Sequence, residues 1–457
     1  MTESNITAKL AEIAIGYEYD QLPAEVVQIA KLAVLDQVGC TVRGVREPLV
    51  EILAEESFGR TISAEEMLSS PAGNASLADT TLVRASAGHA IDFDDTLLPA
   101  HGCHAGTPII SAVLTLANAM PVSGKTLIEA VVAGFEIDSR VASLLTPEHY
   151  FNGFHSTASL GVFGVTAACG KVMGLNQEQM QTAFGIAATQ ASGIKCVFGT
   201  MTKPFNAGKC SANGLLAARL AARGFTSAQN AIEADKGYLE LFIGKAEEER
   251  AIADPSKFKI MGNGFKLHAA CHATHPMIEA INALKNESQF ATEHVEKVAV
   301  RVSELAIKTA SVTEPTTGLE GKFSFPHTAA LALTGLDTAA DSSYEDEILQ
   351  NAELAELRAK VVPFVSEGDL MTTEVTIDLK DGTTLSKGLN FRDLGADLDA
   401  LGQSLQAKFN TNTAGVLEQT AAASLAQLIM DVDACADVGG VVQSICAGES
   451  IGNAVSV

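Results

Sequence analysis

Apolar residues recur with helical spacing through most of the chain between residues 23 and 244. In the segment PAEVVQIAKLAVLDQVG, Val26, Ile29 and Ala33 lie three or four positions apart, so they share one face of a helix. Gly39 is placed to end this helix. Further along, SLGVFGVTAACG and FGIAATQASG are crowded with small residues, which allow neighbouring helices to approach closely. This part of the chain is therefore predicted to be an all-helical domain.

The periodicity changes after about residue 290. VEKVAVRVSELA alternates as a strand does, and MTTEVTIDLKDGTTLSKG predicts a hairpin that turns at Asp381-Gly382. Helical spacing returns in LGADLDALGQSLQAKF and GVLEQTAAASLAQLIMDV. We therefore predict a mainly α chain with a large all-helical domain and a smaller α+β lid domain. The predicted boundaries are 1–267 for the first part of the helical domain, 268–393 for the lid and 394–457 for C-terminal helices that return to the helical domain.

The composition favours packed helices and disfavours some classes of partner. Tryptophan is absent and aromatic residues are 5% of the chain, so the core must be built from Ala, Val, Leu and Ile. The 31 basic and 55 acidic residues give a formal net charge of −24, which repels phosphate backbones and anionic membrane surfaces. We therefore expect neither a nucleic-acid nor a membrane partner.

The protein is expected to be cytoplasmic. Its first twenty residues carry acids early and lack the basic and continuously apolar regions of a secretory signal. The eight cysteines are scattered without a CxxC pair, which is typical of free thiols in a reducing compartment.

An ionisable segment, HAIDFDDTLLPAHGCH, interrupts the helical pattern at residues 89–104. Its three acids and three histidines are Asp92, Asp94, Asp95, His89, His101 and His104. Carboxylate oxygens could bind a divalent cation, solvated acids could end a helix, and a carboxylate beside imidazoles could transfer protons. The common nucleotide-binding and hydrolase signatures are missing from the chain, so these interpretations start without a competing motif.

Two further stretches of the helical part hold ionisable residues. His155 precedes a small-residue helix in YFNGFHSTASLG. Lys203 and Lys209 lie in FGTMTKPFNAGKC, where ammonium groups could bind a carboxylate substrate. A hydrogen-bonded histidine and solvated lysines are the plain structural alternatives.

Two later stretches are similar in character. The first, FKLHAACHATHPMIEA, contains Lys266, His268, Cys271, His272 and His275. Zinc could use cysteine and histidine, but the spacing of these residues matches no familiar zinc site. The second, GKFSFPHTAALAL, places His327 before an alanine-rich helix.

Together these stretches resemble the MmgE/PrpD family over about residues 5 to 430. The family signature H-x-x-D-F-D-D-T, followed by H-P-G, is similar to residues 89–96 and 104–106, with Ala105 in place of proline. GFHSTASLG, GTMTKPFNAG and GFKLHAACHATHPMIEA are similar to three further motifs in the family's order. The family includes 2-methylcitrate dehydratase, cis-aconitate decarboxylase and iminodisuccinate epimerase.

The resemblance implies both a fold and a site. The family fold is a large all-helical domain with a smaller α+β lid, usually in a homodimer, with the site between the domains. The positions that match the family's functional residues, and that the resemblance places in the cleft, are Asp92, Thr96, His104, His155, Lys203 and Lys266. The resemblance also implies a small polycarboxylate substrate, with neither metal nor cofactor.

Two departures from the family pattern concern the substrate. Cys271 followed by His272 is closer to the epimerase-like branch, and FSFPH offers His327 where many members have tyrosine. Cys271 is therefore interpreted as a catalytic candidate, and Thr96, His272 and His327 as substrate-binding candidates.

The resulting hypothesis is a metal-independent lyase or isomerase of the dehydratase or epimerase type. It would abstract a proton next to a carboxylate of a small di- or tricarboxylic acid, with Lys203 and Lys266 neutralising substrate carboxylates and developing charge. Asp92, His104 and His155 would donate and accept protons, with their separate roles left open. The alternatives are a cis-aconitate-type decarboxylase and a non-catalytic polycarboxylate-binding protein of the same fold.

Overall fold

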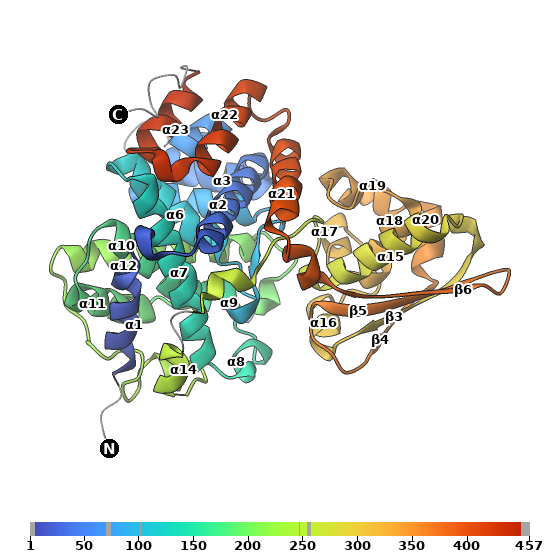
Figure 1. Ribbon diagram of the computed structural model, residues 1–457, viewed down its shortest axis with the longest axis horizontal. Coiled ribbons are helices and arrows are strands. Elements are labelled where there is room, and N and C mark those ends of the chain that lie inside the picture. Colours follow the sequence, from blue (N-terminus) through green and yellow to red (C-terminus); the bar gives the residue numbers. More distant parts are fainter. Residues whose placement is uncertain (1–4, 70–74, 101, 246, 254–256, 449–457) are drawn as a thin grey trace. The chain divides into compact units, whose positions relative to one another are not determined.

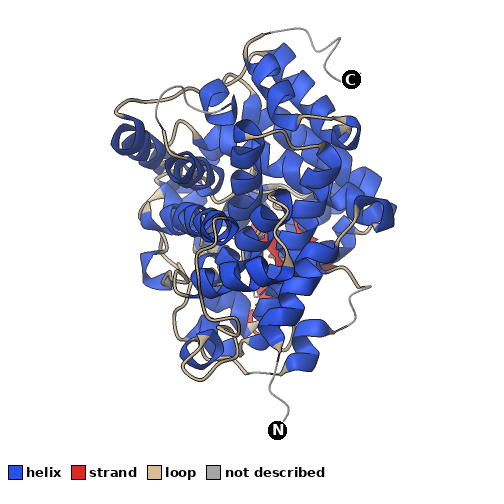
Figure 2. Ribbon diagram, turned by 90° about the vertical axis from the view of Figure 1, so that its left-hand side faces the viewer, coloured by secondary structure: helices blue, strands red, loops and turns tan. Residues whose placement is uncertain are grey.

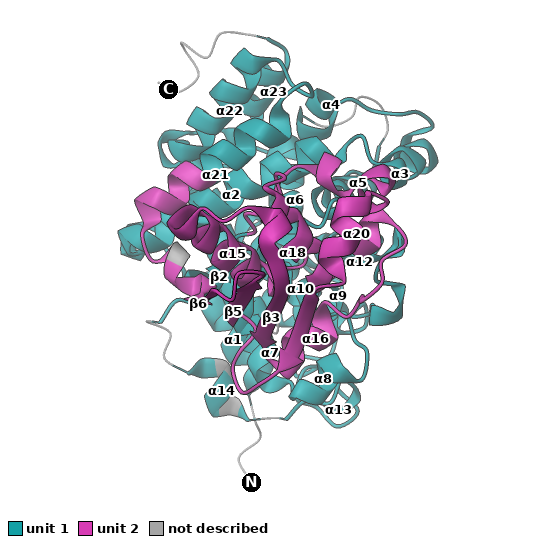
Figure 3. Cartoon of the chain, turned by 90° about the vertical axis from the view of Figure 1, so that its right-hand side faces the viewer, with its two compact units in different colours: residues 1–265, 405–457 teal, residues 266–404 magenta. Residues whose placement is uncertain are grey.

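The computed structural model describes residues 5–69, 75–100, 102–245, 247–253 and 257–448, and His101 of the ionisable segment lies outside them. The chain divides into two compact units (Figure 3). Unit 1 comprises residues 1–265 and 405–457, and unit 2 comprises residues 266–404. Unit 1 is mainly helical, whereas unit 2 combines helices with a sheet. The predicted mainly α fold with a smaller α+β part is therefore confirmed.

Helices account for most of the regular structure in unit 1 (Figures 1 and 2). Within its described residues, the strands are the short antiparallel pair β1 (Thr96–Leu97) and β2 (Asn263–Gly264). None of the described helices is long and apolar enough to cross a membrane. The helices are α1 (Ile6–Gly16), α2 (Ala24–Gly44), α3 (Pro48–Phe58), α4 (Ala64–Ser69), α5 (Leu77–His89), α6 (Gly106–Ala119), α7 (Gly124–Leu144), α8 (Pro147–Phe151), α9 (Ser156–Ser159), α10 (Gly161–Val172), α11 (Gln177–Ala188), α12 (Thr202–Ala222), α13 (Tyr238–Leu241), α14 (Glu248–Ile252), α22 (Gln419–Met430), α23 (Val438–Cys446) and, from residue 405 on, α21 (Leu398–Thr413).

Helix α2 runs further than the sequence pattern predicts. It begins directly after Pro23 and continues through Gly39 to Gly44. A Cβ atom at Gly39 would lie 3.1 Å from Phe409 Cδ2 in α21, so the glycine allows close packing of the two helices. The prediction that Gly39 ends this helix is therefore wrong.

Small residues bring α7 and α10 together, as their sequences predict. A Cβ atom on Gly164 would lie 2.8 Å from the Gly134 carbonyl oxygen, and one on Gly134 would lie 3.0 Å from the Gly164 carbonyl oxygen. Any larger side chain at either position would push the two helices apart.

Unit 2 contains a four-stranded sheet with strand order β4-β3-β5-β6 (Figure 1). Strand β3 is parallel to β4 and antiparallel to β5, which pairs with β6 in an antiparallel hairpin. The strands are β3 (Val295–Val302), β4 (Val361–Val365), β5 (Thr372–Leu379) and β6 (Thr384–Asn390). The helices are α15 (His275–Ser288), α16 (Glu304–Thr309), α17 (Gly318–Gly321), α18 (Phe325–Thr334), α19 (Asp346–Leu349) and α20 (Ala352–Arg358).

The β5–β6 hairpin is confirmed, but β4 was missed by the sequence pattern. Gly382 in the hairpin turn has a φ of 89°, a conformation that glycine adopts without strain. Strand β4 contains Pro363, which argues against a strand in sequence but is tolerated at the edge of a sheet, where β4 lies.

Candidate active site

Helix ends in unit 1 carry most of the ionisable side chains predicted for the site. Helix α5 ends at His89, and residues 90–95, which we call the acidic segment, follow directly. His104 lies just before α6, His155 directly precedes α9, and Lys203 lies in the first turn of α12. Since α12 packs against α5, α6 and α9, these helix ends can meet although their residues are far apart in sequence.

Lys203 and Asp92 form a buried ion pair. The Lys203 ammonium donates to Asp92 Oδ1, and 7% and 6% of the two side chains are exposed. Asp92 has a φ of 54°, in the left-handed region that aspartate tolerates better than most residues. The Phe198 ring centroid lies 5.3 Å from Lys203 Nζ and contributes to the exclusion of water. Electrostatic interactions in such surroundings are stronger than in water.

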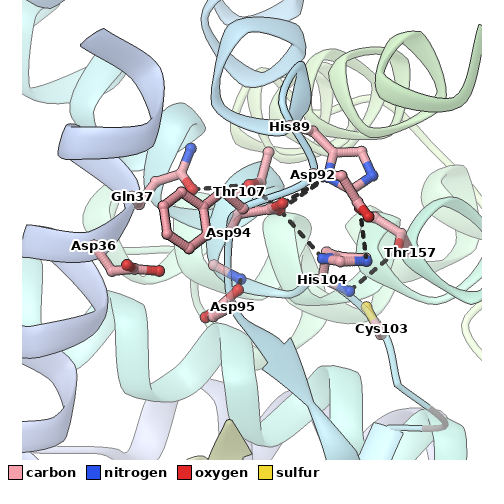
Figure 4. A network of polar contacts seen from close by, with 12 residues as sticks. Asp36, Gln37, His89, Asp92, Asp94, Asp95, Cys103, His104, Thr107 and Thr157 are labelled. Carbon is pink, nitrogen blue, oxygen red and sulfur yellow. Dashed lines mark hydrogen bonds and ion pairs between the residues drawn. The ribbon is translucent and has the colours of Figure 1, made fainter. Parts of the chain in front are cut away.

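Asp94 contacts two histidines (Figure 4). Its carboxylate accepts hydrogen bonds from His89 Nδ1 at 2.8 Å and from the Thr107 hydroxyl at 2.6 Å. His104 Nδ1 lies 3.4 Å from Asp94 Oδ2. Burial opposes ionisation, but the two imidazoles outweigh it and hold the pKa of Asp94 well below its usual value. Asp94 is therefore a buried anion that orients the His89 ring through a hydrogen bond and lies close to the His104 ring.

His104 and His155 are buried and uncharged at neutral pH. Burial lowers the pKa of His104 to about 4, although the Asp94 carboxylate favours the charged ring. Burial, and then the Lys203 ammonium, hold the pKa of His155 well below its usual value. His104 Nε2 lies 3.8 Å from Asp92 Oδ1, so the His104 ring is close to the Lys203–Asp92 ion pair. Neutral imidazoles of this kind can take up or pass on a proton.

The ring of His155 has one nitrogen occupied and one available. The Asn206 amide group donates to His155 Nδ1 at 3.2 Å, which leaves the ring proton on Nε2. Within the described part of the chain, His155 Nε2 and the Thr96 hydroxyl are buried without a hydrogen-bond partner. Buried polar atoms in proteins are normally satisfied, so both groups are available to a polar ligand.

Asp95, the third acid of the segment, has contacts that indicate a structural role. Its carboxyl oxygens accept hydrogen bonds from the Gly106 amide at 3.0 Å and from Asn263 Nδ2 at 2.7 Å. Burial, and then the charges of Asp36 and Asp94, raise the pKa of Asp95 to about 8. Asp95 therefore ties the acidic segment to the start of α6 and to β2.

The other predicted site residues belong to unit 2. Lys266, Cys271 and His272 precede α15 and are 1%, 5% and 4% exposed. The His272 ring centroid lies 4.6 Å from that of His275. Burial, and then the neighbouring His272, His268 and Lys266, hold the pKa of His275 well below its usual value.

His327 lies on a different helix of unit 2, in the first turn of α18. Arg358 Nη1 donates to His327 Nδ1 at 3.4 Å. Burial, and then the Arg358 charge, lower the pKa of His327 to about 4. Its Nε2 atom is buried with no hydrogen-bond partner among the described residues. The membership of Lys266, Cys271, His272 and His327 in one site with the residues of unit 1 stays a prediction.

Metal binding is the main alternative role for the cluster of acidic and histidine side chains that follows α5. Among the described residues, His89, Asp92, Asp94 and His104 have donor atoms that lie within 4.8 Å of one another and could hold an ion. However, the Lys203 ammonium contacts Asp92, and His89 donates to Asp94. A cation would have to displace the first contact and compete with the second, so we keep the metal-free prediction.

Exhaustive chelation is expected to leave activity unchanged, because Asp92 is paired with an ammonium and Asp94 with imidazole donors. Turnover would be measured before and after dialysis against a chelator, together with elemental analysis of the purified protein. Stoichiometric metal whose removal abolishes activity and whose return restores it would contradict the metal-free prediction.

Sequence reasoning did not single out three residues that contact this cluster: Thr107, Asn206 and Lys408. Asn206 follows Lys203 by three positions on α12, a spacing that places both on one helix face. Lys408 shares the apolar face of its helix with Leu401 and Leu405, which indicates a buried partner. Those two signals are present in the sequence.

Comparisons with known proteins cover both units. The family model described as the MmgE/PrpD N-terminal domain matches residues 8–251, and that of the MmgE/PrpD C-terminal domain matches residues 268–434. The chain is similar to a cis-aconitate decarboxylase of Aspergillus terreus, with 25% identity over an alignment of 473 positions that covers 95% of each chain. It is also similar to the cis-aconitate decarboxylase-like protein oryM of Aspergillus oryzae, with 24% identity over 95% of this chain and 96% of that one.

Proposed function

Because the chain belongs to the MmgE/PrpD family, we propose that it is a metal-independent lyase or isomerase of a small di- or tricarboxylic acid. Family membership and the relatives named as decarboxylases support lyase-type enzymatic activity. The finer proposal is proton abstraction from a carbon next to a carboxylate, as in a dehydratase or an epimerase. We further propose that the enzyme is a cytoplasmic homodimer.

The observation that carries this proposal is the buried Lys203–Asp92 pair beside two uncharged histidines. An ammonium in low-dielectric surroundings can stabilise a substrate carboxylate and the negative charge that develops on the adjacent carbon. A neutral imidazole can accept the proton that leaves this carbon or return one to it. Asp92, His104 and His155 are the proposed donors and acceptors.

The charge of the whole chain makes local positive groups necessary. A formal net charge of −24 repels a polyanionic substrate at long range. We therefore propose that Lys203 and Lys266 bind its carboxylates, with Cys271 in the chemical step. Thr96, His272 and His327 are proposed to bind the substrate, through hydroxyl and imidazole groups.

A decarboxylase is the second candidate, because both named relatives are decarboxylases or like one. In that reaction the bond between a carboxylate and its carbon breaks, its electron pair stays on the carbon, and carbon dioxide leaves. The carbon then takes a proton from an acid of the site. The same lysine and histidine groups suit these steps, and 25% identity leaves the choice to experiment.

Incubation with an active substrate in heavy water should introduce deuterium next to a carboxylate if proton abstraction is reversible. An epimerase would give the opposite stereoisomer with deuterium at the inverted centre and no alkene, whereas a dehydratase would give an unsaturated acid that absorbs in the near ultraviolet. Proton magnetic resonance and absorbance on a panel of di- and tricarboxylic acids would distinguish the two products.

Other results of the same experiment would redirect the proposal. Release of carbon dioxide with neither inversion nor loss of water would reject both choices and support the decarboxylase. Thermal stabilisation by polycarboxylates without turnover of any of them would contradict an enzyme and support a binding protein of this fold.

A further inference from the structure

Lys408 is a buried cation that reaches the acidic segment from the C-terminal part of unit 1. Its ammonium donates to the Phe93 carbonyl oxygen at 2.6 Å and lies 3.9 Å from the centroid of the Phe93 ring. It also forms an ion pair with Asp36 Oδ1 of α2 at 2.6 Å. The side chains of Lys408 and Asp36 are 5% and 1% exposed. One ammonium thus connects α21, α2 and the segment that carries the site carboxylates.

Phe93 lies in sequence between Asp92 and Asp94, the two carboxylates that contact the lysine and histidines of the candidate site. Asp92 contacts Lys203, whereas Asp94 contacts His89 and Thr107. The left-handed backbone at Asp92, with φ of 54°, costs aspartate less than most residues but more than glycine, and it persists only when its surroundings hold it. A donor fixed on the next carbonyl group is a direct way to hold it.

Stability alone is a weak reason for this buried pair. The desolvation of two charges offsets much of their attraction, and apolar residues of similar volume often stabilise a fold as well or better. The contact with the Phe93 carbonyl is what such residues could not supply.

We infer that Lys408 is a positioning residue: by holding the Phe93 carbonyl, it fixes the directions in which the Asp92 and Asp94 carboxylates point. This inference rests on the proposed function, in which these carboxylates act in or beside the proton-transfer step. Lys408 acts through them and touches no reacting atom.

A second ion pair provides a matched control. Lys31 Nζ lies 2.6 Å from Asp433 Oδ1, so this pair also joins α2 to the C-terminal part of unit 1. Its side chains are 11% and 28% exposed. Among the described residues, Lys31 has no hydrogen bond to residues 90–95. Loss of this pair would also disturb the packing of α2 on the C-terminal part of unit 1, at Asp433 instead of α21, without releasing the Phe93 carbonyl.

The test compares Lys408→Met, Lys31→Met and the double variant Asp36→Asn/Lys408→Met in the full chain. The double variant removes both buried charges, so it is expected to fold even if Lys408→Met alone does not. For each folded variant, kcat and KM would be measured on the substrate found for the unchanged protein. Amide hydrogen exchange of the peptide that spans residues 90–97 gives a second readout that needs no substrate.

We expect kcat to fall by about 10²-fold in Lys408→Met and in the double variant, because small displacements of catalytic groups have effects of this size. KM should change much less, and exchange in residues 90–97 should become faster. Lys31→Met should keep kcat and this exchange close to those of the unchanged protein. A folded double variant with unchanged kcat and exchange, or equal losses in Lys31→Met, would overturn the inference.

The two readouts separate this inference from the proposed function. If the unchanged protein turns over no polycarboxylate, the proposed function fails, and the exchange of residues 90–97 still decides whether Lys408 holds the segment. If the unchanged protein is active but Lys408→Met and the double variant lose no kcat, the function stands and the positioning role fails.

Discussion

Replacement of Lys203 by alanine should lower kcat/KM by about 10²-fold or more, the loss that commonly follows removal of one preorganised charge partner. The Lys203 side chain is 7% exposed and its ammonium contacts Asp92. Solvent water therefore cannot fully replace the positive charge that the substitution removes. The substrate would lose a carboxylate partner, and Asp92 would lose the group that orients it. Steady-state kinetics on the active polycarboxylate would measure the loss.

Loss of folding must be separated from loss of chemistry in this variant. Breaking a buried ion pair costs roughly 3–5 kcal/mol, which is a large part of the roughly 5–15 kcal/mol that stabilises a typical domain. Circular dichroism and thermal unfolding would therefore accompany the kinetics, and Lys203→Ala/Asp92→Asn would remove the unpaired charge. Lys209→Ala, an exposed position on the same helix, is the matched control and should behave as the unchanged protein. Near-normal kinetics in Lys203→Ala would exclude this lysine from the mechanism.

The fold followed from hydrophobic periodicity where packing agrees with local preference. The alternation in VEKVAVRV and the Asp381-Gly382 turn predicted β3 and the β5–β6 hairpin because both signals are local. The prediction that Gly39 ends α2 failed because this glycine instead leaves room for Phe409. That residue is 370 positions away, so no local pattern could reveal the contact. The difference between the two outcomes is whether the deciding contact is near in sequence.

The family resemblance predicted which residues of unit 1 form the candidate site, but it did not predict their pairings. Lys203 and Asp92 are 111 positions apart, so only the packing of α12 on α5 brings them together. Asp94 and Asp95 show why the residue type alone is insufficient. They are adjacent and chemically identical, yet imidazoles hold the pKa of Asp94 low, whereas burial raises that of Asp95 to about 8.

The second large effect is expected from Lys266→Ala, which should also lower kcat/KM by about 10²-fold or more. Lys266 is 1% exposed, and burial, His272, His268 and then the Lys266 charge lower the pKa of His275 in the same unit. A buried ammonium in an acidic chain is a natural partner for a substrate carboxylate. Lys266→Met, which keeps most of the side-chain volume without the charge, should show the same loss, so the effect would not be one of packing.

Lys360 provides the control within unit 2, because it is a partly buried lysine that donates to the Val295 carbonyl oxygen at 2.9 Å and is not assigned to the site. Lys360→Ala should change stability more than turnover. Calorimetric measurement of substrate binding would show whether Lys266 stabilises the bound substrate or only the transition state. A loss confined to KM indicates equal binding of ground and transition states, whereas an equal loss in kcat and kcat/KM indicates an interaction made in the transition state. A folded Lys266→Ala variant with unchanged kcat and KM would exclude Lys266 and leave Lys203 as the proposed carboxylate partner.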